Sequence, residues 1–166
     1  AANYGRIVMT TSSSGLFGNF GQSNYSAAKM ALVGLMQTLA LEGAKYNVHV
    51  NALAPTAATR MTEGLLAPEV LRALRPEAVS PAMLVLAHES APTRTILCAG
   101  AGSFEASHIT MTQGVHISTD CVPLDDMDVY LAEHLAQVLD RKGDLVPDNG
   151  FVQADVEIQK ALKKLH

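Results

Sequence analysis

The chain has little of what several common functions require. Only two of its 166 residues are cysteines, and they lie in unrelated contexts, Cys98 in an apolar run and Cys121 in a polar loop. We therefore expect neither a disulfide framework nor a metal site. Twelve lysines and arginines against 16 acidic residues give a net charge of -4. This balance argues against a nucleic-acid partner, because phosphate binding needs clustered basic side chains.

Long hydrophobic runs are missing as well. No apolar stretch approaches the roughly 18 residues of a membrane span, and no signal peptide is recognised before the first expected strand. We therefore expect no membrane partner and a reducing compartment, the cytoplasm by default or the peroxisome if the source is eukaryotic. With 48% hydrophobic residues the chain can still bury a core of domain size.

Three reactive side chains stand out among the residues that are present. Tyr25 and Lys29 are four residues apart in an expected helix, so their side chains share a face, with roughly 5–6 Å between Cβ atoms. A neighbouring cation favours the phenolate, which makes a tyrosine a better acid or base near neutral pH. Ser12 precedes Tyr25 by thirteen residues and would steady the reacting oxygen by a hydrogen bond. The pair alone would more often be a solvated lysine beside a half-buried tyrosine.

The surroundings of these side chains favour a functional site. Arg6-Ile7-Val8-Met9 predicts a buried strand, and the small polar run Thr10-Thr11-Ser12-Ser13-Ser14-Gly15 follows it. Open α/β sheets bind their ligands at the carboxyl ends of parallel strands. The polar run is therefore interpreted as one wall of a site.

Three segments carry a resemblance to a known family: Tyr4-Gly5-Arg6-Ile7-Val8-Met9-Thr10; Gly15-Leu16-Phe17-Gly18-Asn19-Phe20-Gly21-Gln22, which leads into Tyr25 and Lys29; and Asn51-Ala52-Leu53-Ala54-Pro55. From Tyr4 to about Ile117 the sequence resembles the C-terminal half of a short-chain dehydrogenase/reductase. Within that family it is most similar to the (3R)-hydroxyacyl-CoA dehydrogenase unit of multifunctional β-oxidation enzymes.

The resemblance implies a role for each residue of the site. Ser12 would orient the substrate, Tyr25 would donate and accept the proton, and Lys29 would hold the ribose of NAD or NADP and lower the pKa of the tyrosine. Cofactor contacts are expected from Tyr25, Lys29, Pro55, Thr56, Ala58 and Thr59, and substrate contacts from Ser14, Phe20 and Gln22. The implied reaction is hydride transfer between the nicotinamide and a secondary alcohol or ketone, with a (3R)-3-hydroxyacyl-CoA as the favoured substrate.

The pattern and the resemblance together predict an α/β fold, the C-terminal half of a doubly wound (Rossmann-type) parallel sheet with a helical C-terminal extension. Three parallel strands are expected at 6–9, 48–54 and 95–99, and a short extended run at 107–111. Helices are expected from Ser23 or Asn24 to about Ala44, at Pro68 and Ser80, and over 125–141 and 152–165. The long helix has an apolar stripe of Ala28, Leu32, Leu35 and Leu39, widened by Val33 and Met36. The expected domains are 1–117, a partial dinucleotide-binding domain, and 118–166, the helical extension.

The glycine turn that holds a dinucleotide pyrophosphate is not found. Gly15, Gly18 and Gly21 are evenly spaced, whereas that motif needs Gly-x-Gly and an acidic residue about 20 positions on. Since the first strand resembles one from the middle of the family's fold, we expect the cofactor-binding half to lie outside this chain. The alternative hypothesis is a catalytically silent fragment or assembly half. The expected partner is the missing N-terminal half or a second copy of the chain, in a homo-oligomer.

Overall fold

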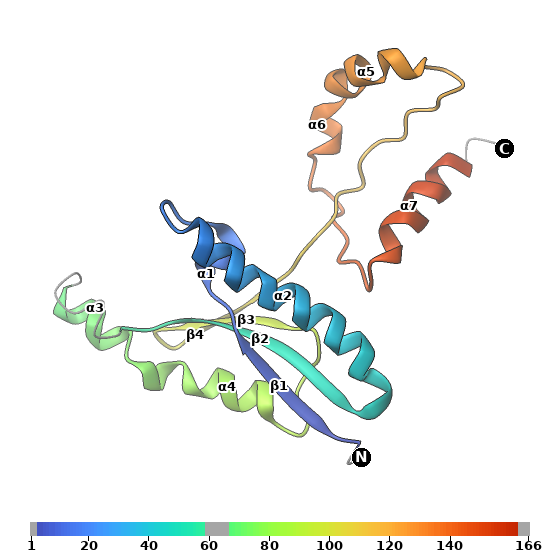
Figure 1. Ribbon diagram of the computed structural model, residues 1–166. Helices are drawn as coiled ribbons and strands as arrows, with labels where there is room; N and C mark the ends of the chain where they lie inside the picture. The colour runs from blue at the N-terminus through green and yellow to red at the C-terminus, as the bar shows by residue number, and fades with distance from the viewer. Residues whose placement is uncertain (1–2, 59–66, 163–166) are drawn as a thin grey trace. The chain divides into compact units, whose positions relative to one another are not determined.

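The computed structural model describes residues 3–58 and 67–162 of the chain (Figure 1). The chain divides into two compact units, Ala1–Ser107 and His108–His166. The domain boundary after residue 117 stays a prediction. Within the second unit, Met111 forms a β-bridge with Leu145.

The first unit is built on a sheet with the strand order β1-β2-β3-β4. The strands are β1 (Gly5–Thr10), β2 (Val48–Thr56), β3 (Ile96–Gly100) and β4 (Ser103–Ser107). The three expected strands are present and parallel, and β4 runs antiparallel to β3. The Rossmann-type fold class predicted from the sequence is thereby confirmed.

The fourth strand corrects the sequence prediction of an extended run at 107–111. Strands β3 and β4 are joined by Ala101 and Gly102, which both have positive φ, 51° and 78°. Two such residues form a tight hairpin turn. The chain therefore reverses directly after β3, and the paired residues are Ser103–Ser107.

Helices cover both faces of the sheet. The short helix α1 (Ser13–Phe17) and the long helix α2 (Ser23–Gly43) lie on one face, and α4 (Ser80–Ala87) lies on the other (Figure 1). Side chains of β2 alternate between two apolar clusters, as expected for a strand buried on both faces. Val50 and Ala52 pack with α2, and Leu53 packs with α4.

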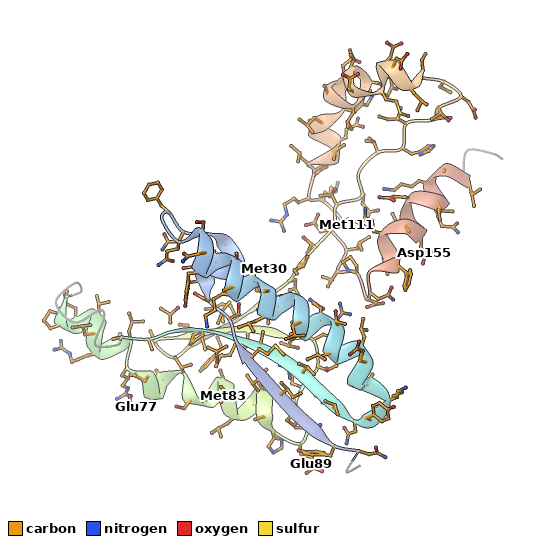
Figure 2. All side chains as sticks on the ribbon, viewed as in Figure 1. Met30, Glu77, Met83, Glu89, Met111 and Asp155 are labelled. Carbon is orange, nitrogen blue, oxygen red and sulfur yellow. The ribbon has the colours of Figure 1, made fainter. Side chains whose placement is uncertain are left out.

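The buried stripe of α2 differs from the expected one. The helix buries Val33, Met36, Ala40 and Gly43, whereas Leu35 is 47% exposed. The helix begins at Ser23, one of the two predicted starting residues, with Gln22 at the cap position and no side-chain capping bond. Figure 2 shows Met30 on α2 and Met83 on α4, above and below the sheet.

The remaining helices of the first unit are short. Helix α3 spans Pro68–Ala73 and α4 begins at Ser80, both with proline in the first turn, as predicted. The described residues also form 3-10 turns at Ala44–Tyr46 and Pro76–Ala78 and, in the second unit, at Leu124–Asp126.

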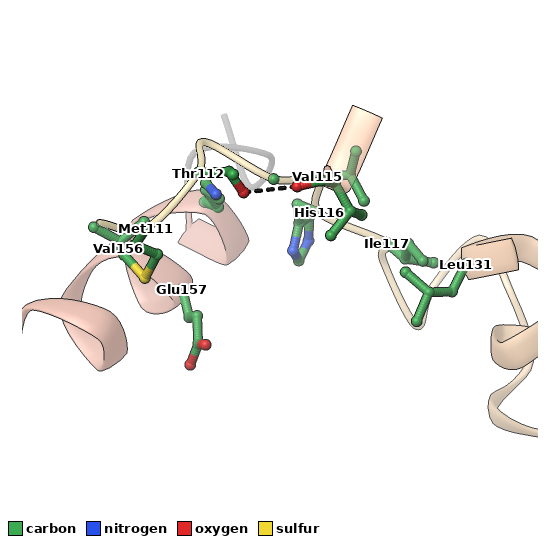
Figure 3. Close-up of a pocket in the computed structure, with 11 residues that line it drawn as sticks. Met111, Thr112, Val115, His116, Ile117, Leu131, Val156 and Glu157 are labelled. Atoms are coloured by element: carbon green, nitrogen blue, oxygen red, sulfur yellow. Dashed lines mark hydrogen bonds between the residues drawn. The ribbon is translucent and has the colours of Figure 1, made fainter. Parts of the chain in front are cut away.

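The second unit contains α5 (Met127–Glu133), α6 (Leu135–Val138) and α7 (Phe151–Leu162). The single helix expected over 125–141 is interrupted at His134, whose ring stacks on Tyr130 with 4.3 Å between centroids. Figure 3 shows a pocket of about 330 Å³ in this unit, with Met111, His116 and Val156 among its lining residues. Among the described residues, no helix is long and apolar enough to cross a membrane.

Candidate active site

The end of β1 places Ser12 at the start of a helix. Thr11 continues the pairing of β1 with β2 by donating its N–H to the carbonyl of Leu53 at 2.8 Å. Ser12 is the N-cap of α1, in an extended conformation, and its Oγ accepts the N–H of Ser14 at 3.2 Å. A hydroxyl that accepts one bond still has its own proton to donate. Ser12 is therefore suited to hold an oxygen atom at the strand end.

Helix α2 carries the other two predicted catalytic side chains. The ammonium of Lys29 lies 5.7 Å from the centroid of the Tyr25 ring, so the predicted pair is close in space. Lys29 Nζ also donates to the carbonyl of Thr10 at 2.9 Å. Tyr25 is 43% exposed. The structure thus brings the lysine to the phenol ring and to the end of the strand that leads to Ser12.

A close contact holds α1 against α2. A Cβ atom on Gly15 would lie 2.7 Å from the Cβ of Lys29, so only glycine fits there without a shift. Thr11, which is 1% exposed, donates its hydroxyl to the carbonyl of Lys29 at 2.8 Å. These contacts hold Lys29 of α2 close to α1 and to the end of β1.

Two of the three predicted substrate residues, Phe20 and Gln22, lie on the loop between the two helices. Gly18 and Gly21 have φ of 78° and 76°, values that favour glycine. Between them, the side chain of Phe20 is fully exposed. Gln22 accepts a bond from the Asn19 side chain at 3.2 Å. Ser14, the third predicted substrate residue, lies in α1 beside Ser12.

The predicted cofactor residues Pro55 and Thr56 are the last two residues of β2, and Ala58 follows them. Pro55 and Thr56 pair with β3, and a Cβ on Gly100 would lie 2.8 Å from Thr56. Ala58 donates its N–H to the carbonyl of Leu74 at 2.6 Å, so this amide is already engaged. Thr59 lies outside the described residues.

Two buried polar residues that the sequence did not single out are Thr11, beside this site, and Asn51, in the middle of β2. Asn51 is fully buried, donates to the carbonyl of Pro92 at 2.7 Å and accepts the N–H of Thr95 at 3.1 Å. It thereby ties the connection before β3 to the middle of β2. A polar side chain inside an apolar strand was the available signal, because buried polar groups almost always have partners.

We also searched the described residues for metal ligands and for reactive thiols outside the candidate site. No group of three or more His, Cys, Asp or Glu side chains is placed to hold a metal ion in the part of the chain that the structure describes. Burial raises the pKa of the Cys98 thiol, and the Glu105 carboxylate raises it further. Cys98 pairs with Glu105 across β3 and β4, apart from the predicted catalytic residues.

Comparison with protein families and known proteins supplies independent evidence. Residues 1–69 match the family model of the short chain dehydrogenases. A short-chain type dehydrogenase/reductase of Mycobacterium tuberculosis is 59% identical over 104 residues, which are 62% of this chain and 36% of that protein. The peroxisomal hydratase-dehydrogenase-epimerase of Saccharomyces cerevisiae is 62% identical over 87 residues, 52% of this chain and 10% of that protein.

A solved structure matches along most of the chain. The full-length peroxisomal multifunctional enzyme type 2 of Drosophila melanogaster has a TM-score of 0.81 at 34% identity, covering 98% of this chain and 29% of that one. The chain thus spans only about a third or less of the length of these relatives. The comparisons confirm the resemblance that the sequence predicted: the chain is similar to the short-chain dehydrogenases and, among them, to the peroxisomal multifunctional enzymes.

Proposed function

We propose that Ser12, Tyr25 and Lys29 carry the proton chemistry of an oxidoreductase that transfers a hydride between NAD or NADP and a secondary alcohol or ketone. The observation that carries the proposal is the position of the Lys29 ammonium, 5.7 Å from the Tyr25 ring centroid and bonded to the strand end that precedes Ser12. The favoured substrate is a (3R)-3-hydroxyacyl-CoA. The similarity to a hydratase-dehydrogenase-epimerase supports the dehydrogenase reaction in this proposal.

Each residue has a distinct task in this proposal. Tyr25 exchanges a proton with the substrate oxygen through its phenol group. Lys29 places its charge beside the phenol ring, and Ser12 donates a hydrogen bond to the same substrate oxygen. The nicotinamide, when bound, supplies or accepts the hydride.

The residues present fit the ribose end of such a cofactor. An ammonium has three protons, and Lys29 donates one to Thr10, which leaves donors for the ribose hydroxyls. Thr56 is exposed at the end of β2 and can contribute its hydroxyl there. We also propose Pro55 and Thr59 as cofactor contacts. The Ala58 amide must leave Leu74 before it can bind a ligand.

A second candidate function is an assembly half without activity of its own. No Gly-x-Gly-x-x-Gly sequence follows a strand in these 166 residues, and such a turn is the usual pyrophosphate site. We propose that a separate cofactor-binding half supplies it, and that this half or a second copy of the chain pairs with β1. Because several relatives are peroxisomal enzymes, the peroxisome is the proposed location in a eukaryotic source, and the cytoplasm otherwise.

The substrate is tested with the two enantiomers of 3-hydroxybutyryl-CoA. The chain is combined with its proposed cofactor-binding half, and NADH formation from NAD is followed by absorbance. We expect turnover of the (3R) form and little of the (3S) form. Equal rates would contradict the proposed stereochemistry, and no turnover of either form or of a simple secondary alcohol would favour the assembly role.

A further inference from the structure

We propose that Thr11 is a positioning residue of the candidate active site: its buried hydroxyl fixes the helix that carries Tyr25 and Lys29 against the strand end that carries Ser12. The proposal rests on the function proposed above, because it adds a residue to the same site. Thr11 itself is not expected to contact substrate or cofactor, since it is 1% exposed.

Two hydrogen bonds make Thr11 a link between elements. Its N–H donates to Leu53 at 2.8 Å, which anchors it to the sheet. Its hydroxyl donates to the backbone carbonyl of Lys29 at 2.8 Å, which anchors α2. Water has little access to this bond, and in such surroundings a hydrogen bond is electrostatically stronger than at the surface.

The hydroxyl of Thr11 donates to Lys29 itself, so this hydrogen bond acts on one of the predicted catalytic residues. Two adjacent residues hold Lys29: Thr11 binds its backbone carbonyl, and Thr10, the last residue of β1, binds its ammonium. Ser12 follows Thr11 directly in the chain. Any shift of α2 relative to Thr11 therefore changes the distance between the Tyr25 phenol and the Ser12 hydroxyl.

Gly15 supports the same alignment from α1. A Cβ there would lie 2.7 Å from the Lys29 Cβ and 3.1 Å from its carbonyl carbon. Lys29 is thus bounded by Thr11 and by α1. A packing role alone would be satisfied by valine at position 11, because valine has nearly the shape of threonine without its hydroxyl.

Two substitutions at Thr11 distinguish the effect of its hydroxyl group from the effect of its shape. Thr11→Val keeps the volume and removes the donor, whereas Thr11→Ser keeps the donor and removes a methyl group. The matched control is Thr112→Val in the second unit. Thr112 also donates its hydroxyl to a helix carbonyl, that of Val138, at 2.7 Å (Figure 3).

The first measurement is steady-state kinetics of the chain combined with its cofactor-binding half, using (3R)-3-hydroxybutyryl-CoA and NAD. We expect Thr11→Val to lower kcat by about 10- to 100-fold, as for a misplaced catalytic group, with KM changed by less than about threefold. Thr11→Ser and Thr112→Val should stay within about threefold of the unsubstituted protein. Unchanged kcat in Thr11→Val, or equal losses in Thr11→Ser and Thr11→Val, would overturn the proposal.

The second measurement needs no turnover and separates this proposal from the proposed function. Nuclear Overhauser contacts between the Lys29 ε-methylene and residues 10–11 are recorded in the 166-residue chain. We expect Thr11→Val to lose them and both Thr11→Ser and Thr112→Val to keep them. That result with an inactive unsubstituted protein would refute the proposed reaction and support the positioning role, whereas contacts that persist in Thr11→Val would refute the positioning role.

Discussion

Gly15 and Lys29 are in such close contact that a single added carbon atom on Gly15 would lie 2.7 Å from the Lys29 Cβ. Real Cβ atoms essentially never approach that closely. Gly15 belongs to the evenly spaced glycine series of the sequence, and this contact explains why position 15 requires glycine. It lets α1 and α2 meet beside the candidate active site.

Gly15→Ala should therefore destabilise the protein. Overpacking of a tight contact costs about 1–3 kcal/mol, and the displaced α1 should carry Ser12 away from α2. The free energy of unfolding, measured by urea denaturation, checks this. Gly34→Ala is the matched control, because Gly34 also lies in a helix but a Cβ there meets nothing within 4 Å.

The free energy of unfolding of the control variant should not fall. Alanine in a helix interior is favoured over glycine by roughly 0.5–1 kcal/mol, so Gly34→Ala should be neutral or stabilising. Equal unfolding free energies for the two variants would show that α1 can move away from α2 without cost.

The Cys98 thiol should react slowly with iodoacetamide. Burial raises its pKa, and Glu105 raises it further, so at neutral pH less of it is thiolate, the reactive form. Its alkylation rate, measured in the Cys121→Ser variant, should keep rising at pH values where an ordinary thiol has reached its plateau. Cys121, measured in Cys98→Ser, is exposed and serves as the reference.

Glu105→Gln should speed this reaction, because removing the negative charge lowers the pKa of Cys98 toward its ordinary value. Burial is the larger cause, so Cys98 should still react more slowly than Cys121. A rate for Cys98 equal to that of Cys121 in the unsubstituted Glu105 background would refute the burial effect.

The isolated 166-residue chain should not bind NAD or NADP appreciably. The ribose contacts proposed for Lys29 cannot replace a glycine turn and a helix N-terminus for the pyrophosphate. Titration calorimetry is the direct measurement. A dissociation constant in the range of about 1–10 µM would show that these residues hold the whole cofactor.

Strand β1 should be an assembly edge. It is a terminal strand of the described sheet, and Ile7 on it is 40% exposed. Open apolar edges recruit other strands, so we expect a dimer, a higher oligomer or a complex with the cofactor-binding half. A monodisperse monomer by light scattering, with protected amide exchange along residues 6–10, would argue that the sheet is self-sufficient.

The sequence predicted the parts of the fold that local pattern determines. Apolar runs and the Tyr25–Lys29 spacing were enough for the three parallel strands and for the long helix that carries the pair. Pattern did not determine which face of α2 is buried, because the helix is apolar around much of its surface, and Val33 and Met36 rather than Leu35 point into the core. It also missed β4, since the turn that creates it uses positive φ at Ala101, a residue without turn preference.

The site shows the same division. Residue types, spacing and the family resemblance predicted a site at Ser12, Tyr25 and Lys29, but the contacts around these residues link positions far apart in the chain. The bond from Thr11 to Lys29 spans 18 positions and that from Asn51 to Pro92 spans 41. Such partners follow from tertiary packing, which no local pattern contains.

The Tyr25→Phe variant tests whether Tyr25 exchanges the proton with the substrate. The matched control is Tyr46→Phe, because Tyr46 is similarly exposed at 48% and has the Lys45 ammonium 4.9 Å from its ring centroid. Both variants are assayed for kcat with (3R)-3-hydroxybutyryl-CoA and NAD, with the cofactor-binding half present. We expect Tyr25→Phe to lower kcat by about 10²- to 10⁴-fold, with its unfolding free energy and the activity of Tyr46→Phe unchanged. Near-normal turnover by Tyr25→Phe would refute the role of Tyr25 in proton exchange.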